Sequence, residues 1–173
     1  MPAAAVAIRL LVAADLPAYK VLRDDMLFAH PEAFTSDAAE ERAKEPTDYL
    51  HRLGLDRRER GQFVLGAWRS ERLLGAIGCE REARLKVRHI GHVIGMMVRP
   101  EARGSGLGAL LLEACIAEAR HAGLEMLTLT VTAENAGAVR LYERHRFVAY
   151  GTLRRALKVG AHYHDKLHMA LVL

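Results

Sequence analysis

The run Arg103-Gly104-Ser105-Gly106-Leu107-Gly108 leads directly into a strongly helical segment, Leu107 to His121. Apolar residues recur in that segment at helical spacing, which predicts an amphipathic helix. An apolar segment from Val87 to Val98 precedes the glycine run and Pro100 ends it, whereas a short apolar run from Met126 to Val131 follows the helix. Both segments are typical of strands. The sequence therefore predicts an α/β domain centred on a strand, loop, helix, strand unit.

The three glycines of this run, at 104, 106 and 108, favour an anion at the start of the helix. Without side chains, the backbone can come close to a ligand and expose its N–H groups. The first turn of a helix has N–H groups without intrahelical partners, and the helix dipole favours negative charge there. Arg103 and Arg99 add positive charge, and arginine can bind a phosphate through two hydrogen bonds. A phosphate group is the expected ligand.

The identity of the phosphate ligand remains open at this point. The run lacks the lysine followed by serine or threonine of a P-loop. Gly104, Gly106 and Ala109 match the dinucleotide pattern with alanine last, and Glu134, after the next strand, stands where a ribose-binding acid could stand. However, five residues separate Val98 from Gly104, whereas a dinucleotide loop normally leaves its strand directly. A dinucleotide therefore stays as the minor alternative.

The rest of the chain extends the same α/β pattern without a repeat or a linker. Asp15 is expected to cap a helix that runs to about Ala29, because the residue before Pro31 leaves the helical region. Polar helices are expected at 37–44 and from Pro46 to Gly61 at the latest. Further strands are expected at 6–12, 62–68, 73–81, 147–157 and 163–173, and Gly91 and Gly95 within 87–98 indicate a bulge or a close backbone approach. The predicted order is one strand, three helices, three strands, and then helix, strand, helix and two strands.

Composition predicts one soluble domain over residues 1–173 and excludes several classes of partner. Half of the 173 residues are hydrophobic, and no stretch approaches the ~20 apolar residues of a membrane span. The N-terminus lacks the basic start of a signal peptide, so we expect a cytoplasmic protein. The net charge of +4 is spread along the chain, and aromatic residues, at 6%, do not alternate with basic ones, so no nucleic-acid surface is expected. Cys79 and Cys115 are interpreted as small buried residues.

Two motifs resemble those of the GNAT superfamily of N-acetyltransferases. The family's pyrophosphate loop has the form Gln/Arg-x-x-Gly-x-Gly/Ala, which Arg103, Gly106 and Gly108 match. About 30 residues later, the segment 135–147 (Asn-x-x-Ala-x-x-Leu-Tyr-Glu-x-x-x-Phe) resembles the family's second motif. Arg146 stands where the family often has glycine. Two motifs in the expected order make the resemblance specific, although residues 1–60 carry no diagnostic motif.

The resemblance implies a GNAT fold: a mixed, mostly antiparallel sheet of about six to seven strands with a splayed parallel pair, flanked by about four to five helices. It also implies acetyl-CoA as cosubstrate, with no metal. The pantetheine arm would pair with the backbone at Met97 and Val98, and Asn135 would approach the cofactor. The pyrophosphate would rest on the loop and first helical turn, formed by Arg103, Gly104, Ser105, Gly106, Leu107, Gly108 and Ala109.

The implied reaction is the direct attack of a neutral primary amine on the thioester, most simply with a small-molecule acceptor. Protein N-termini or lysines, or cofactor binding without turnover, are the alternatives. Tyr142, the tyrosine of the second motif, is the candidate proton donor to the leaving thiolate. A base must also deprotonate the amine. His89 and His92 lie on the strand that leads to the loop, and His92 is the candidate base because neutral histidine suits this task at physiological pH.

The acceptor site is expected between the N-terminal helices and the last strands, and a homodimer is possible. Its candidate lining residues are Phe28, Phe34, Tyr49, Tyr163 and Asp165. The alternation of side chains along a strand would place His162, His164 and His168 on one face, where a surface or acceptor-site role is favoured over metal binding.

Overall fold

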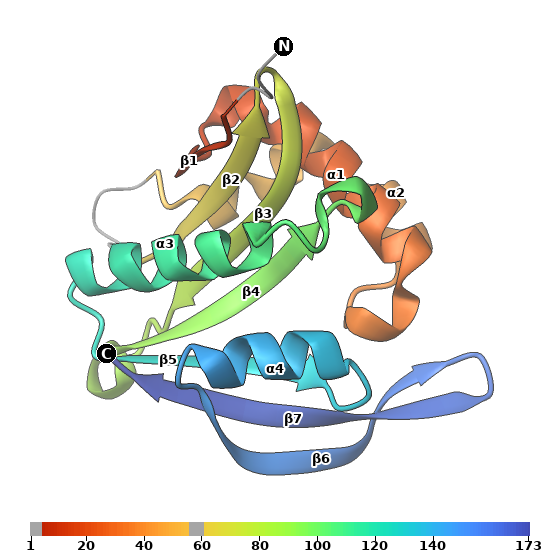
Figure 1. Cartoon of the computed structure of the whole chain (residues 1–173), viewed down its shortest axis with the longest axis vertical. Helices are drawn as coiled ribbons and strands as arrows, with labels where there is room; N and C mark the ends of the chain where they lie inside the picture. Colours follow the sequence, from red (N-terminus) through yellow and green to blue (C-terminus); the bar gives the residue numbers. More distant parts are fainter. Residues whose placement is uncertain (1–4, 56–60) are drawn as a thin grey trace.

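The structure, a computed structural model, describes residues 5–55 and 61–173, and a seven-stranded sheet organises it (Figure 1). The strands are β1 (Ala7–Leu10), β2 (Phe63–Arg69), β3 (Arg72–Arg81), β4 (Ile90–Val98), β5 (Met126–Thr132), β6 (Val148–Val159) and β7 (His162–Val172). The α-helices are α1 (Leu16–Ala29), α2 (Ala38–Arg42), α3 (Leu107–His121) and α4 (Ala136–Arg144). The 3₁₀ segments are η1 (Ala13–Asp15), η2 (Pro31–Ala33), η3 (Pro46–Leu53), η4 (Leu85–Val87) and η5 (Pro100–Ala102).

The sheet is antiparallel except at its centre. Its strand order is β1-β2-β3-β4-β5-β7-β6, and β4 and β5 form the one parallel pair among the described strands. Helix α3 connects these two strands, as a parallel connection requires. Their pairing covers only Ile90 to His92 on β4 and Met126 to Thr128 on β5. Beyond these residues both strands continue without pairing to each other, so the sheet opens towards their C-terminal ends.

A bulge in β4 lies just beyond the point where the parallel pairing stops. The register between β3 and β4 shifts there, and Gly95 has a φ of 56°. A left-handed backbone at this point favours glycine, because a Cβ would be strained. Gly91 has a different reason: a Cβ there would lie 2.7 Å from Leu124 and 2.8 Å from the Cys79 sulfur. The two glycines thus serve a bulge and a close packing contact, respectively.

Two hydrophobic cores lie on opposite faces of the sheet, because side chains alternate along each strand. Phe63 and Leu65 of β2 face the core that α3 and α4 cover, whereas Val64, between them, faces the core beneath α1 and η3. Figure 1 shows α3 crossing β2–β4 and α4 lying over β5 and β7 on the near side. Burial on both faces explains why β2 and β3 are almost continuously apolar.

The structure confirms the predicted fold class and most of the predicted elements. Helix α3 has the predicted bounds, and the two cysteines are buried. The start of the strand predicted at Val87 is wrong: η4 occupies Leu85–Val87, and the strand begins at Ile90. The third helix is the 3₁₀ segment η3, which ends at Leu53 because Gly54 is left-handed. The sequence also has a pair of adjacent basic residues, Arg57 and Arg58, which lies outside the described residues.

A buried ion cluster joins α1, α2 and η3 on the second face. The Glu41 carboxylate accepts hydrogen bonds from Arg23 Nε (2.6 Å) and from the Tyr49 hydroxyl (2.7 Å), and Lys44 also donates to it. Burial alone would raise the pKa of Glu41, but the hydrogen bonds from Arg23, Lys44 and Tyr49 outweigh it and lower the pKa to about 2. The cluster therefore holds a charged carboxylate within the helical layer.

We expect Glu41→Gln to lower the free energy of unfolding by about 3 kcal/mol at pH 7, because Arg23 would be left buried without its counter-charge. The folded-state pKa of Glu41 lies below its ordinary value of 4.5, so its contribution is complete above that pH and is lost as the pH falls towards 2. Urea unfolding at several pH values measures both effects. Glu40→Gln, at an exposed position of the same helix, is the control, and equal stability of the two variants would contradict the expectation.

Candidate functional site

The glycine run forms the uncapped beginning of α3. Gly104 and Gly106 have φ values of 73° and 83°, and no atom lies within 4 Å of where their Cβ atoms would be. Gly106 is the N-cap residue, so no side chain caps the helix. The first intrahelical bond runs from the Leu110 N–H to the Gly106 carbonyl oxygen, which leaves the preceding N–H groups of the first turn without intrahelical acceptors. This end of α3 can accept an anion through its backbone.

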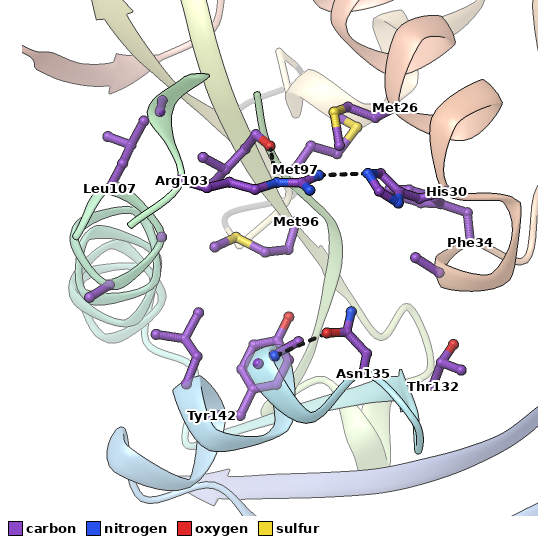
Figure 2. Close-up of a pocket in the computed structure, with 18 of the residues that line it drawn as sticks. Met26, His30, Phe34, Met96, Met97, Arg103, Leu107, Thr132, Asn135 and Tyr142 are labelled. Atoms are coloured by element: carbon purple, nitrogen blue, oxygen red, sulfur yellow. Dashed lines mark hydrogen bonds between the residues drawn. The ribbon is translucent and has the colours of Figure 1, made fainter. Parts of the chain in front are cut away.

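A cavity of about 860 Å³ extends from this helix end into the opening between β4 and β5 (Figure 2). Its volume is within the range of small-molecule and cofactor sites. Ten of the twelve residues predicted to bind the cofactor or act in catalysis line it: Met97, Val98, Arg103, Gly104, Gly106, Leu107, Gly108, Ala109, Asn135 and Tyr142. Ser105 and His92 are not among the lining residues; the Ser105 hydroxyl donates instead to the Ala102 carbonyl oxygen (2.7 Å).

Figure 2 shows the Arg103 side chain reaching from the glycine loop to His30, and both residues line the cavity. Its Nε donates to the Val98 carbonyl oxygen (3.3 Å), and its Nη2 donates to His30 Nε2 (2.8 Å). Because Nε2 accepts this bond, the proton of a neutral His30 lies on Nδ1, which is 3.5 Å from a carboxylate oxygen of Glu32. Arg99, the other arginine expected near a phosphate, is bound elsewhere, to Asp25 and the Leu73 carbonyl oxygen.

Tyr142 reaches the cavity from α4. Its ring is buried and packs edge-on against Phe147, with 5.8 Å between the ring centroids. Figure 2 shows its hydroxyl directed towards the space below Met96. No described residue forms a hydrogen bond with this hydroxyl, which leaves it available to a ligand. Burial, with a contribution from the nearby Cys115 thiol, raises the pKa of Tyr142 above its usual value, so the hydroxyl is protonated near neutral pH.

Asn135 caps α4 at the edge of the same cavity. Its side-chain oxygen accepts a hydrogen bond from the Ala138 N–H (3.2 Å), which is the N-cap geometry that the sequence suggests. Its side-chain amide nitrogen remains available to a ligand. The cap fixes the side chain at the point where β5 passes into α4.

His92 lies at the closed end of the opening, in the last pair of the parallel register. Its Nδ1 is hydrogen-bonded to the Thr128 hydroxyl, and its Nε2 is 3.1 Å from a Glu82 carboxylate oxygen. The structure therefore does not bring His92 to the cavity with Tyr142. The assignment of His92 as a base stays a prediction that the geometry does not favour.

The wall of the cavity opposite α3 contains residues that the sequence did not assign to an acetyl-CoA site, and of these Glu134 had a role only in the dinucleotide alternative. Met26, His30, Glu32 and Ala33 come from the end of α1 and from η2, and Thr132 and Glu134 come from the end of β5. Among the five acceptor-site candidates only Phe34 is a lining residue. The Tyr49 hydroxyl donates to Glu41, and Phe28 is largely exposed. Asp165 accepts a hydrogen bond from the Arg155 N–H, and the Arg155 guanidinium stacks on Tyr163.

Of the three histidines on the last strand, only His164 lines the cavity. Its Nδ1 lies 3.8 Å from a carboxylate oxygen of Glu134, and its side chain is 22% exposed. His168 packs against Tyr150 instead. The alternation along the strand indicated that the three histidines share a face, but only the tertiary contacts of β7 could show which one reaches the site.

Comparisons with known proteins agree with this geometry. The family model described as "Acetyltransferase (GNAT) family" matches residues 20–147. A mycothiol acetyltransferase of Geodermatophilus obscurus is 31% identical over 124 residues, which are 70% of this chain, but the match spans only 37% of that protein's length.

Two solved structures extend the similarity over nearly the whole chain. The ribosomal-protein-alanine N-acetyltransferase of Brucella melitensis is 27% identical, with a TM-score of 0.82 over 96% of this chain and 99% of its own. The protein yncA of Salmonella typhimurium, solved with its cofactor acetyl-CoA, has a TM-score of 0.83 at 22% identity, over 97% of this chain and 94% of its own. No described helix is long and apolar enough to cross a membrane. The chain belongs to the GNAT family of acetyltransferases.

Proposed function

We propose that this protein is an N-acetyltransferase that moves the acetyl group of acetyl-CoA to a primary amine, most simply of a small molecule, by direct attack in a ternary complex. The observation that carries the proposal is the uncapped N-terminus of α3, which opens into a cavity between β4 and β5. A protein N-terminus or lysine is the second candidate acceptor, because a solved relative is named for a ribosomal-protein alanine.

The residues of the cavity fit acetyl-CoA. The glycine loop and the first turn of α3 offer free N–H groups to a diphosphate, and Arg103 can add a charged donor. The β4 backbone at Met97 and Val98 lies along the opening, where a pantetheine arm can pair with it. Acetyl-CoA would supply the activated acetyl group and a thiol leaving group.

Tyr142 would act as the proton donor. As the new C–N bond forms and the C–S bond breaks, the departing sulfur gains negative charge, and a neutral hydroxyl beside it can donate a proton. The support is the unpaired hydroxyl in the cavity and the pKa raised by burial.

His164 fits the role of the proton acceptor better than His92. It lines the cavity, and Glu134 lies beside its Nδ1, so a neutral ring with the proton on Nδ1 would offer the Nε2 lone pair to the attacking amine. A carboxylate that orients a histidine in this way is a recurring arrangement in enzymes. The amine proton would move to Nε2 as nitrogen attacks the carbonyl carbon.

Acetyl-CoA in 100-fold excess over its Kd is expected to raise the melting temperature by roughly 5–10 °C, whereas NAD and NADP should not. If NAD raised the melting temperature and acetyl-CoA did not, the proposal would be overturned. In Gly106→Asp the shift should vanish, because a carboxylate would occupy the space meant for the diphosphate. Gly123→Asp is the matched control, since Gly123 also has a positive φ (76°) and open space around it but lies beyond the other end of α3.

Tyr142→Phe should lower turnover roughly 100-fold and leave the acetyl-CoA thermal shift intact, because only the donated proton is lost. Release of free thiol with a panel of primary amines measures turnover. Tyr150→Phe, at an exposed tyrosine of β6, is the control. Undiminished turnover in Tyr142→Phe would remove the residue from the mechanism.

His164→Ala is expected to lower turnover roughly 100-fold in the same thiol assay, because the amine would lose its proton acceptor. His168→Ala controls for the loss of an imidazole from the same face of β7, and it should be active. The comparison with His92→Ala decides between the two histidines: a loss in His92→Ala with none in His164→Ala would return the role of base to His92.

A further inference from the structure

The part of the cavity opposite α3 has a composition that restricts the acceptor. We call it the acceptor wall and define it by Met26, Glu32 and Phe34 on one side and by Thr132, Glu134 and His164 on the other. An inference about the acceptor rests on the proposed function, because it assumes that the amine enters across this wall while the cofactor occupies the α3 side.

Charge is divided between the two sides of the cavity. The acceptor wall carries the carboxylates of Glu32 and Glu134, whose side chains are 44% and 59% exposed. The lining arginines come from other elements: Arg103 begins the glycine loop, although its guanidinium reaches His30, and Arg144 is at the end of α4 remote from Asn135. Two carboxylates favour a protonated amine at this wall and disfavour an anion.

Other cations near the wall are already engaged. Lys166, which follows His164 on the same face of β7, donates to the Thr35 hydroxyl (2.6 Å) and does not line the cavity. The Arg103 guanidinium reaches His30, but a diphosphate on the adjoining loop would neutralise it. The described residues of the acceptor wall therefore include no lysine or arginine that could pair with a carboxylate of the acceptor.

The same wall offers an apolar surface beside its carboxylates. Met26 is almost fully buried, Phe34 is partly buried, and both border the cavity. The Thr132 hydroxyl donates to the Glu32 carbonyl oxygen (2.6 Å), which ties the η2 segment to the end of β5. An apolar group of the acceptor can thus pack against a fixed surface while its ammonium group lies near the carboxylates.

We propose that the acceptor is a cationic primary amine that carries an apolar group and has no carboxylate beside the amine. A free α-amino acid is rejected, because its carboxylate would face Glu32 and Glu134 without a partner. Amines and amino-acid amides of the same side chain are accepted. Glu32 and Glu134 attract the protonated amine. Its ammonium proton leaves to solvent before the attack, and the second amine proton moves to His164 as the C–N bond forms.

Two matched series of compounds test this: tyramine, L-tyrosinamide and L-tyrosine, and isopentylamine, L-leucinamide and L-leucine. Within each series the side chain is kept and only the group beside the amine changes. Thiol release from acetyl-CoA should give a kcat/KM at least about 10-fold lower for the amino acid than for the amine, because like charges at close range oppose binding. Comparable values for amino acid and amine would overturn the proposal.

Substitutions of the two carboxylates test whether Glu32 and Glu134 cause the rejection of free amino acids. Glu32→Gln and Glu134→Gln should each lower kcat/KM for tyramine about three-fold at low salt, as expected for exposed charges. Each should also reduce the ratio of kcat/KM for tyramine to kcat/KM for L-tyrosine. Glu143→Gln removes an exposed carboxylate of α4 outside the cavity and should change neither value. If this ratio of kcat/KM is unchanged in both Glu32→Gln and Glu134→Gln, the assignment of selectivity to the two carboxylates is overturned.

The thermal shift with acetyl-CoA distinguishes a failure of the acceptor proposal from a failure of the proposed function. If acetyl-CoA stabilises the protein but none of the six compounds releases thiol, the acceptor proposal is overturned and the proposed cofactor stands. If acetyl-CoA does not stabilise the protein, the proposed function itself is overturned. Turnover of the amides but not of the simple amines would assign the site to peptide N-termini, which lack a carboxylate beside the amine as well, and would contradict the small-molecule acceptor.

Discussion

The early end of the parallel pairing between β4 and β5 is the constraint on which the rest of the site depends. After His92 and Thr128 the two strands no longer share hydrogen bonds, although β4 continues to Val98 and β5 to Thr132. Their unpaired backbone must be satisfied by another group, because buried N–H and C=O groups are costly when left alone. The bulge at Gly95 turns β4 away at this point. An extended ligand with amide groups could pair with such an edge, and the cavity lies where the two strands no longer pair.

Helices line this opening on both sides. On one side α3 packs its apolar face on β2 and β3 and leaves its N-terminus free. On the other side the cluster of Arg23, Glu41 and Tyr49 ties α1, α2 and η3 together. A buried ion cluster of this kind contributes little net stability compared with apolar packing, but it is costly to break. It fixes the end of α1, and with it the position of Met26 at the wall of the cavity.

The sequence was sufficient where function depends on one continuous segment. The glycine loop, the bounds of α3 and the cap at Asn135 follow from local rules for helix ends, and all of them are present in the structure. The base was harder to assign. The position of His92 on the strand that leads to the loop favours it as the base, but the parallel register places it at the closed end of the opening, bonded to Thr128. His164 could not be selected from three equivalent histidines, because its position depends on the pairing of β7 with β5 and β6.

The difference between local patterns and tertiary contacts also explains why the acceptor is harder to infer from the sequence than the cofactor. The acceptor wall and its surroundings are joined by contacts between residues far apart in the chain: Arg103 to His30, Thr132 to Glu32 and Lys166 to Thr35 are separated by 73, 100 and 131 residues. No local pattern reports such contacts. Under the proposed function, a loop that bound phosphates through its backbone would constrain only its glycines, whereas a wall that selected an amine could change through a few side chains on η2 and β7. Members of one fold family can therefore share a cofactor site and differ in acceptor, and the charges of Glu32 and Glu134 are the part of this chain where such a difference would be found.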